Sequence, residues 1–441
     1  MTRNTIYALS TVYGKSGVAV IRVSGDKVLD ILSQITSIDI NTITPRHTYF
    51  TNIINPKTKD ILDKSLVIYF KAPYSFTGED VLEIHCHGSK AVLNSVLNVL
   101  SEQSGTRLAE PGEFSKRAFY NNKMDLTEAE GLADLIDAET SEQQKYAFRQ
   151  LSGNLKNLYS SWRENLVRVL SYLEAFIDFP EEDIPENLYQ EILNTVFKIK
   201  EDITLHLKGN NVTERLKNGF KIVIAGATNA GKSSLINTLT KRNAVIVSDI
   251  AGTTRDAIDI NLDIKGYPII ITDTAGIRET DNPIEQQGIL IAKEKITSAD
   301  IIINLYDAKT SSKDDTLDQT KTIYVANKID KLSREELNNL PSNHLKISAK
   351  QNIGIDNLVD AILNIIKENF ANSSNHLITR KRYREALIEC LEHLNNFSLE
   401  KEIELSAEDI RLSCRSIGKI TGHVEVDEIL DNIFGSFCIG K

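Results

Sequence analysis

One short stretch of the chain has the residue types and spacing of a phosphate-binding loop. Gly226–Ser233 reads GATNAGKS and fits the pattern G-x-x-x-x-G-K-S. It follows the apolar run Phe220–Ala225 and precedes the helix-like run Ser234–Leu239, which is the strand–loop–helix context such a loop requires. Backbone N–H groups of the loop surround phosphate oxygens, and the following helix points its positive end at them. We expect Lys232 to reach the β- and γ-phosphates and Ser233 to ligate Mg²⁺.

Further motifs, most of them directly after an apolar run, predict that the nucleotide is GTP. Asp273–Gly276 (DTAG) supplies a carboxylate that holds Mg²⁺ through water and a glycine amide that meets the γ-phosphate. In Asn327–Asp330 (NKID) the carboxylate of the last residue accepts two hydrogen bonds from guanine. Adenine does not present this pair of donors, so the motif selects against ATP. Ser348–Lys350 (SAK) closes over the base, and Gly252–Asp256 (GTTRD) supplies Thr254 to the Mg²⁺ shell. Five motifs in the order of a GTPase exceed what composition produces by accident.

The residue after the DTAG motif sets this chain apart from the small GTPases, in which a Gln at that position orients the attacking water. Here it is Ile277, so water must be placed and charge neutralised in another way. Asn229 in the phosphate loop could help coordinate a monovalent cation beside the β–γ bridge, or could simply suit the loop. Glu285, twelve residues past Asp273, could orient water through a second water, or could be a solvated residue at a helix start.

The composition indicates a multidomain enzyme of a reducing compartment. The 441 residues allow roughly three domains, and a hydrophobic content of 41% is enough for real cores. Four cysteines without a C-x-x-C pair argue against a disulfide framework. No signal-peptide pattern opens the chain, and no apolar stretch reaches the roughly 18 residues that span a membrane. We therefore expect a cytoplasmic protein with no membrane span.

The net charge of -10 argues against nonspecific nucleic-acid binding, which depends on neutralising phosphates. Any RNA contact must therefore be local. Thr379–Arg384 (TRKRYR) is the densest basic run that contains an aromatic residue, but alone it is better interpreted as a solvated helix start.

The chain is organised in three kinds of segment. Residues 1–120 mix strand-like runs, such as Gly17–Val23 and Leu66–Phe70, with loops, and predict an α+β domain. Residues 121–218 and 371–441 have helical periodicity. Between them, residues 219–370 predict a P-loop GTPase domain with a doubly wound, mostly parallel sheet, in which Ala257–Ile264 alternates as an edge strand would. The economical interpretation is one helical domain with the GTPase domain inserted into it.

Two cysteines lie in patterns that could do chemistry. Cys438 is fourth from the end, but Gly440 and Lys441 fit a prenylation box poorly. A nearby lysine could activate its thiol as a nucleophile; from the residues alone we favour a buried structural cysteine. Cys86 lies in His85–His87, where strand alternation would put both imidazoles on one face, but no further metal ligands occur at convincing spacing.

Beyond these motifs, the whole chain resembles the tRNA-modifying GTPases of the MnmE (TrmE) family. The resemblance is carried by Ser75–Glu83 (SFTGEDVLE), Pro111–Phe119 (PGEFSKRAF), Ile177–Glu182 (IDFPEE), the NAGKSS loop and the terminal FCIGK. It implies an N-terminal folate-binding domain related to tetrahydrofolate-dependent aminomethyl carriers, a helical domain and an inserted GTPase domain. It also implies a homodimer formed through the N-terminal domains.

The same resemblance implies an activity and a partner. With a flavin-binding (FAD) protein of the MnmG (GidA) type, in a heterotetramer, the family adds a (carboxymethyl)aminomethyl group to C5 of the wobble uridine, position 34, of certain tRNAs. Two other classes remain as alternatives. A ribosome-assembly GTPase shares the hydrophobic residue after D-x-x-G, but it would be expected to carry a basic RNA-binding module, which the sequence does not show. A folate-dependent one-carbon enzyme regulated by GTP is supported by the N-terminal resemblance alone.

Residue by residue, the resemblance implies the following sites. The positions that contact 5-formyltetrahydrofolate, or a related tetrahydrofolate, are matched by Arg22, Glu83, Lys123 and Lys441. The K⁺ ligands are matched by Asn229, Ser248, Ile250 and Thr253, and the Mg²⁺ ligands by Ser233 and Thr254. Glu285 matches the hydrolytic glutamate and Cys438 the cysteine implicated in tRNA modification, which reverses the interpretations from spacing alone. The predicted GTP contacts are Asn229, Ala230, Gly231, Lys232, Ser233, Ser234, Ser248, Asp249, Ile250, Ala251, Gly252, Thr253, Thr254, Asp273, Thr274, Ala275, Gly276, Asn327, Lys328, Asp330, Ser348, Ala349 and Lys350.

The chain departs from the family pattern in two places. Thr228 stands where the family often has proline, and the usual glycine-rich start is thinned to Gly14–Gly17. Neither departure changes a predicted ligand side chain.

Overall fold

The computed structural model describes residues 4–179, 185–208, 210–227, 229–245, 259–273, 294–310, 318–371, 380–424, 430, 433–435 and 437–440. The chain forms two compact units, each made of segments that are far apart in sequence. Unit 1 contains Met1–Ala133, Gln150–Ser160 and Ile417–Lys441, and unit 2 contains Asp134–Arg149 and Ser161–Ser416. No helix within the described residues is long and apolar enough to cross a membrane.

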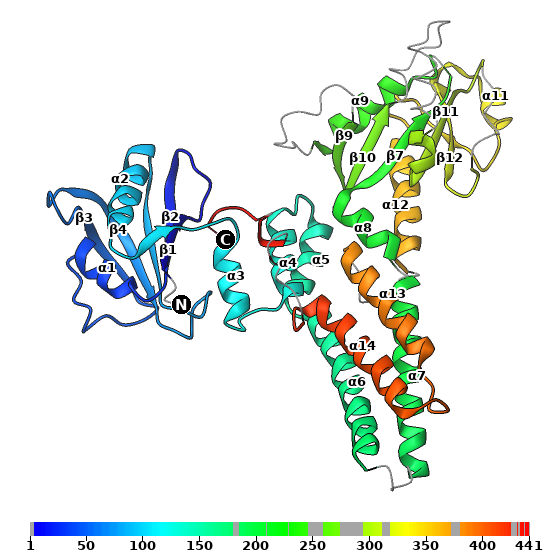
Figure 1. Cartoon of the computed structure of the whole chain (residues 1–441). Helices are drawn as coiled ribbons and strands as arrows, with labels where there is room; N and C mark the ends of the chain where they lie inside the picture. The colour runs from blue at the N-terminus through cyan, green and yellow to red at the C-terminus, as the bar shows by residue number, and fades with distance from the viewer. Residues whose placement is uncertain are drawn as a thin grey trace, which may run out of the picture. The chain divides into compact units, whose positions relative to one another are not determined.

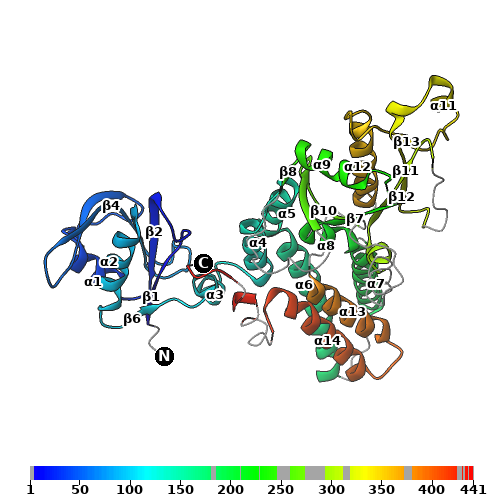
Figure 2. The same cartoon turned by 90° about the horizontal axis from the view of Figure 1, so that it is seen from above.

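Unit 1 is built on a six-stranded sheet with the order β3-β4-β5-β2-β1-β6. The strands are β1 (Thr5–Leu9), β2 (Ser16–Ser24), β3 (Thr48–Ile54), β4 (Ile61–Phe70), β5 (Val81–Gly88) and β6 (Thr106–Leu108). All neighbours are antiparallel except β1 and β6, which run parallel. Two amphipathic helices, α1 (Val28–Ile35) and α2 (Lys90–Ser101), pack their apolar residues against one face of this sheet (Figures 1 and 2).

The other face of the sheet is covered only in part. Phe114, from α3 (Glu113–Tyr120), packs on Ile6 and Ala8 of β1. Farther along the sheet, Phe50 and Leu66 lie directly opposite each other on β3 and β4 and are 64% and 42% exposed. This region therefore presents an apolar surface in the part of the chain that the structure describes.

The end of the chain returns to unit 1. Phe434 and Phe437 pack with Leu126 and Ala129 of α4 (Leu126–Ile136) and with Phe119 of α3. Phe434 is 1% exposed, and its ring centroid lies 5.4 Å from that of Phe437. The aromatic side chains at the C-terminus are therefore part of a hydrophobic core of unit 1.

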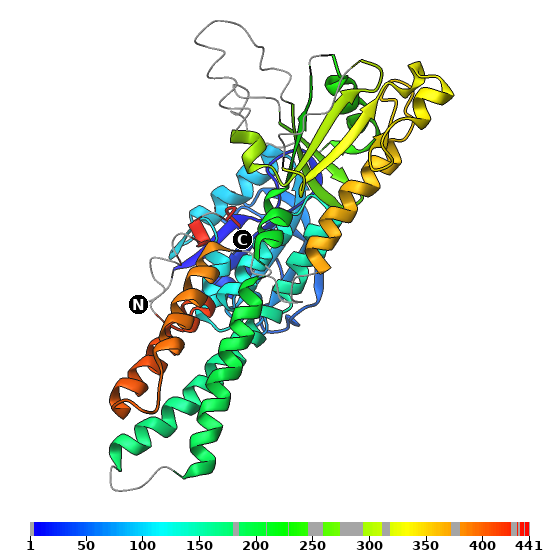
Figure 3. The same ribbon diagram turned by 90° about the vertical axis from the view of Figure 1, so that its right-hand side faces the viewer.

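The helical part of unit 2 is dominated by long helices that run alongside one another (Figure 3). They and the shorter helices are α5 (Ser141–Leu151), α6 (Asn154–Asp178), α7 (Glu186–Lys208), α8 (Asn210–Asn218), α13 (Lys381–Asn396) and α14 (Ile403–Thr421). One apolar face of α6 is buried at Trp162, Leu166, Val169 and Leu173. Because α13 follows the GTPase segment and packs on α7, which precedes it, the helices on either side of the GTPase segment meet.

The GTPase part of unit 2 is a seven-stranded sheet with the order β13-β12-β11-β7-β10-β9-β8. The strands are β7 (Phe220–Ala225), β8 (Ala244–Val245), β9 (Asp259–Ile264), β10 (Tyr267–Asp273), β11 (Ile301–Asp307), β12 (Thr322–Asn327) and β13 (Leu345–Lys346). The helices are α9 (Lys232–Arg242), α11 (Arg334–Asn338), α12 (Ile355–Ala371) and the 3₁₀ turn η2 (Ile329–Lys331). The strands from β13 to β10 are parallel, and α9 and α12 share one apolar core with them.

The predicted α+β, all-α and P-loop GTPase parts are therefore confirmed, with one correction. The segment Ala257–Ile264 was expected at the sheet edge, but β9 pairs on both sides, with β10 and with β8. The short strand β8 takes the edge, and its two residues carry too little alternation to be recognised. The exact four-segment division of the chain stays a proposal, since the compact units group the helical segments differently.

Candidate nucleotide, folate and terminal-segment sites

The phosphate-binding loop has the local geometry that its glycines require. Gly226 has φ +140°, and a Cβ there would lie 1.9 Å from the Leu305 carbonyl oxygen of β11. Gly231, at φ +100°, caps α9, and a Cβ there would lie 2.3 Å from Asn327 Nδ2. Both positions accept only glycine, because the neighbouring strand and the next motif lie directly against the loop.

The charged group of this loop points inward. Lys232 is 8% exposed, and its Nζ donates to the carbonyl oxygens of Gly226 and Ala227 at 2.5 and 3.2 Å. The amine thus lies inside the curve of the loop, where it would meet the phosphates. Ser233 and Ser234 are exposed on the first turn of α9, so the Ser233 hydroxyl is accessible to Mg²⁺.

The guanine side of the site is assembled by side chains of the NKID and SAK motifs. Ser348 Oγ donates to Asp330 Oδ1 at 2.5 Å, which orients the carboxylate. Asn327 is 2% exposed; its Nδ2 donates to the Ala230 carbonyl at 2.8 Å and its Oδ1 accepts from Ala349 N at 3.0 Å. One buried amide therefore ties the phosphate loop to the SAK loop.

Lys328 contributes a second tie on the same side. Its backbone has φ +64°, and its Nζ donates to the Asn229 carbonyl at 2.6 Å and to Asp307 Oδ2 at 2.8 Å. Burial alone would raise the pKa of Asp307, but the hydrogen bonds from Lys328 Nζ and Lys309 N, together with the nearby lysine charges, outweigh it and the pKa is lowered. Asp307, at the end of β11, was missed from the sequence because it belongs to no short motif. The signal available was its place at the carboxyl end of a buried strand next to β12.

Several predicted site residues lie outside the described part of the chain. They are Ser248, Asp249, Ile250, Ala251, Gly252, Thr253, Thr254, Thr274, Ala275, Gly276, Glu285 and Lys441. Asp273 ends β10, as predicted, and β10 runs parallel to β7, which leads into the phosphate loop. The ligand roles of the residues outside the described part of the chain stay predictions.

The predicted folate residues Arg22 and Glu83 lie opposite each other on β2 and β5. Arg22 donates from Nε and Nη2 to Glu83 Oε1 at 3.1 and 2.9 Å, and both side chains are about four-fifths buried, at 20% and 18% exposure. The Arg22 guanidinium lies over the rings of Phe76 and Phe114, at 5.2 and 5.7 Å from their centroids. Oε2 of Glu83 keeps contact with His85 Nε2 at 3.3 Å. The Arg22 guanidinium is thus a planar cation that lies over two rings and beside a carboxylate on an open sheet face. This arrangement suits a flat heterocycle with amine donors.

The third predicted folate residue reaches the same loop from another side. Lys123 is exposed, and its side-chain carbons lie 3.2 Å and 3.4 Å from where a Cβ would stand on Gly78. Gly78 is two residues past Phe76, so the loop between β4 and β5 has Arg22 beside Phe76 and Lys123 beside Gly78.

A buried ionic network supports α3 and was not found from the sequence. Arg117 is 5% exposed; its Nη1 donates to Glu79 at 2.8 Å and its Nη2 to Glu113 at 3.0 Å. Arg107 pairs with Glu113 through two further hydrogen bonds. Burial favours the neutral acid, but the hydrogen bonds from the two arginines and from Glu110 N lower the pKa of Glu113 overall. The conspicuous PGEFSKRAF segment therefore has a structural role that its charges could not reveal without their partners.

Cys438 is exposed, whereas Cys86, Cys390 and Cys414 are buried. The interpretation from spacing alone, a buried structural cysteine, is therefore wrong. The pKa of the Cys86 thiol is raised to about 11, mainly by burial, so Cys86 is a core residue of β5. No group of side chains suited to a metal ion occurs among the described residues, the two histidines of β5 included. His87 pairs with Asp63 instead.

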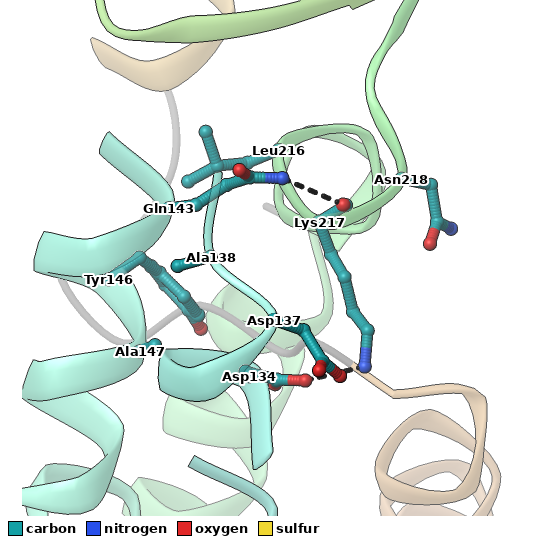
Figure 4. Close-up of a pocket in the computed structure, with 9 residues that line it drawn as sticks. All are labelled: Asp134, Asp137, Ala138, Gln143, Tyr146, Ala147, Leu216, Lys217 and Asn218. Atoms are coloured by element: carbon teal, nitrogen blue, oxygen red, sulfur yellow. Dashed lines mark hydrogen bonds and ion pairs between the residues drawn. The ribbon is translucent and has the colours of Figure 1, made fainter. Parts of the chain in front are cut away.

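The basic run at the start of α13 is used within unit 2. Arg380 Nη2 lies 2.8 Å and Lys217 Nζ 2.6 Å from Oδ1 of Asp134, near the end of α4. Arg384 pairs with Glu214 of α8 at 3.4 Å. Figure 4 shows the pocket beside this cluster, where Gln143 also donates to the Lys217 carbonyl at 3.1 Å. The segments that enter and leave the GTPase domain are thus held by one buried carboxylate.

A mostly parallel sheet with the phosphate-loop motif after β7, the NKID motif after β12 and the SAK motif after β13 defines a P-loop GTPase. Two family models match the chain: "GTP-binding protein TrmE N-terminus" over residues 5–123 and "MnmE helical domain" over residues 126–438. Similar relatives are the proteins named tRNA modification GTPase MnmE from Rickettsia bellii and Rickettsia prowazekii. Each is 47% identical over 99% of this chain and 100% of the relative.

The chain belongs to the MnmE (TrmE) family. Among solved structures it is similar to the G domain of the T. maritima FeoB iron transporter, with 24% identity, a TM-score of 0.24, and coverage of 33% of this chain and 98% of that one. A GTP-binding protein from Sulfolobus solfataricus in complex with GDP matches with 18% identity, a TM-score of 0.25, and coverage of 48% and 67%.

Proposed function

We propose that this protein is a K⁺-dependent GTPase that takes part in modifying C5 of the wobble uridine of certain tRNAs. The observation that carries the proposal is the guanine side of the site, where Ser348 orients Asp330 and Asn327 joins the phosphate loop to the SAK loop. Family membership supplies the class of RNA substrate, since the relatives are tRNA modification GTPases. The product would be a (carboxymethyl)aminomethyl group at position 34.

The metal requirement follows from residue types. Ser233 and Thr254 would hold Mg²⁺, whose charge bridges the β- and γ-phosphates. Asn229, with Ser248, Ile250 and Thr253, would hold K⁺ in the place of an arginine finger, and Glu285 would orient the attacking water. Asn229 has φ +70°, a conformation that asparagine tolerates better than most residues, and it is exposed.

The folate proposal concerns unit 1. Arg22, Glu83, Lys123 and Lys441 would hold 5-formyltetrahydrofolate or a related tetrahydrofolate. The pairing of Arg22 with Glu83 beside two aromatic rings supports it, because a pterin ring stacks well there and its amino-pyrimidine edge donates to a carboxylate.

The proposed partners are a second copy of the chain and a flavin-binding protein of the MnmG type, in the cytoplasm. The apolar surface of Phe50 and Leu66, on the same sheet as Arg22, supports a homodimer through the N-terminal domains, since an exposed apolar patch of a sheet marks an interface.

The deciding experiment measures modified wobble uridines in tRNA from a strain that lacks the gene, with and without a plasmid copy. Restoration by the wild type but not by a Lys232→Ala variant supports the proposal. Normal modification in the deletion strain would overturn it. A ribosome-assembly GTPase is the second candidate, but the basic run that would serve RNA is engaged with Asp134, Glu214 and Glu385. Co-sedimentation with ribosomes separates the two.

A further inference from the structure

The last described residues of the chain are held to unit 1 by backbone contacts at two separate places. At the first, Ser10 Oγ donates to the Gly440 carbonyl oxygen at 3.1 Å. At the second, Gly112 N donates to the Cys438 carbonyl oxygen at 3.4 Å. The hydrophobic contacts of Phe434 and Phe437 would tolerate small shifts of the segment, but these two hydrogen bonds fix it along its length.

Two glycines allow the close approach at these places. A Cβ on Gly440, which has φ +98°, would lie 2.2 Å from the carbonyl oxygen of Leu9. A Cβ on Gly112, at φ +65°, would lie 2.4 Å from the carbonyl oxygen of Phe434. By contrast, Gly435 has no atom within 4 Å of its Cβ position. Glycine is therefore required where the segment is attached and not merely because the segment turns.

Each attachment point is two residues away in sequence from a residue that neighbours Arg22. Ala8, two residues before Ser10, is the cross-strand neighbour of Arg22. Phe114, two residues after Gly112, carries the ring under the Arg22 guanidinium. The two contacts thus fix the terminal segment to the same strand and the same helix that surround the Arg22–Glu83 pair, and they leave Cys438 exposed.

We propose that Ser10, Gly112 and Gly440 form a latch that sets the position of the Cys438 thiol beside the Arg22–Glu83 pair. They are positioning residues for tRNA modification, since none of them needs to touch the tRNA or the folate. The inference rests on the proposed roles of Cys438 and Lys441, but it concerns residues that neither role includes.

The test uses the full-length protein with its flavin-binding partner and three single variants. Gly440→Ala introduces the clash with Leu9, Ser10→Ala removes one hydrogen bond, and Gly435→Ala is the matched glycine-to-alanine control in the same segment. A nitroxide on Cys438 reports its motion, because Cys438 is exposed and the other three cysteines are buried. Modification of tRNA, affinity for 5-formyltetrahydrofolate and the GTP hydrolysis rate are measured in parallel on unlabelled protein.

We expect Gly440→Ala to lower kcat/KM for modification at least about tenfold and Ser10→Ala about three- to tenfold, the latter being what one net hydrogen bond supplies. Nitroxide motion should become faster and folate binding weaker in both, with hydrolysis within twofold of wild type. Gly435→Ala should match the wild type throughout.

Three outcomes would overturn the latch. Unchanged nitroxide motion and modification in both test variants would show that the contacts do not position the segment. An equal loss in Gly435→Ala would point to general sensitivity of the terminus. A parallel fall of hydrolysis and melting temperature would indicate a structural role. If the wild type fails to bind folate but modifies tRNA, the folate proposal falls, and nitroxide motion and modification still decide on the latch.

Discussion

The nucleotide site and the terminal-segment site of this protein are built in opposite ways. The nucleotide site uses short contiguous motifs, each at the end of a strand of one sheet, so the backbone of each motif carries its own geometry. The terminal-segment site joins the middle of a sheet face to residues at the other end of the chain; Ser10 and Gly440 are 430 positions apart. We therefore expect the nucleotide site to tolerate changes elsewhere in the chain. The terminal-segment site, by contrast, depends on the docking of the C-terminal segment onto unit 1.

The largest effect should come from Cys438→Ser, because it removes the thiol without changing the shape of the segment. We expect wobble-uridine modification to be abolished and K⁺-stimulated GTP hydrolysis to stay nearly intact. The melting temperature should also be unchanged, since an exposed hydroxyl is solvated and causes no desolvation penalty. Mass spectrometry of tRNA, a phosphate-release assay and a thermal melt check the three parts.

Full modification by the serine variant would exclude an essential role of the thiol. A fall of both activities together with a lower melting temperature would break the comparison, because the two sites would then not be separable.

Asp330→Asn tests the nucleotide site in the opposite direction. The carboxylate that Ser348 orients would lose two charge-assisted hydrogen bonds to guanine, so GTP affinity should fall by about 10²–10³-fold. Xanthosine triphosphate should bind better than GTP, since the new amide can donate to the extra carbonyl. Calorimetric titration with both nucleotides measures the exchange, and 5-formyltetrahydrofolate affinity is the control that should not move. Unchanged GTP affinity would contradict the assigned role.

The same contrast explains what the sequence could and could not predict. The runs Phe220–Ala225 and Thr322–Ala326 were located nearly to the residue, because a motif that must follow a strand also marks where the strand ends. Asn327 was predicted as a GTP contact, but its hydrogen bonds to Ala230 and Ala349 were not predicted. They join two loops that only the fold brings together.

In unit 1 the limits are stricter. The resemblance identified Arg22 and Glu83, but not that they pair, since strand register decides which residues face each other. Nothing in the composition of the C-terminus could show that its aromatics are buried while Cys438 is exposed. The network of Arg117 with Glu79 and Glu113 was likewise invisible, because a charged side chain is by default assigned to the surface.

The next prediction concerns the monovalent cation. Hydrolysis should be at least about tenfold faster in K⁺ than in Na⁺, because a cation would stand where an arginine finger neutralises transition-state charge. Asn229→Gly should lose this difference and still bind GTP. Glycine is the sharper substitution than alanine, because φ at this position is +70° and alanine would add backbone strain. Phosphate release in matched KCl and NaCl buffers measures the two hydrolysis rates. Equal rates for the wild type would contradict the proposed role of K⁺.

The smallest effect is expected from a buried carboxyl in unit 1, and it should leave both sites working. Asp125 is 8% exposed at the start of α4, where Oδ1 accepts from Thr127 Oγ1 and Glu128 N, both at 2.8 Å. Burial raises its pKa from 3.8 to about 6, although those hydrogen bonds work in the other direction. At this carboxyl the folded protein therefore binds a proton more tightly than the unfolded chain, so the contribution of Asp125 to stability is greatest below about pH 4 and is lost as the pH rises through about 6.

Asp125→Asn keeps the accepting oxygen but cannot ionise, so it should remove this pH dependence. At pH 7 the variant should be more stable by roughly 1–2 kcal/mol, somewhat below the full linkage value because the new amide N–H₂ is buried. At pH 4, where Asp125 is largely protonated in the folded protein, the two proteins should differ little. Urea unfolding at pH 4, 5, 6 and 7 gives the curve, with GTP affinity at pH 7 as the control. A difference in stability between the two proteins that stays constant from pH 4 to 7 would show that Asp125 does not carry the effect. GTP affinity that changes with the variant would mean that the helix on which the terminal segment packs also reaches the nucleotide site, and the separation of the two sites would have to be given up.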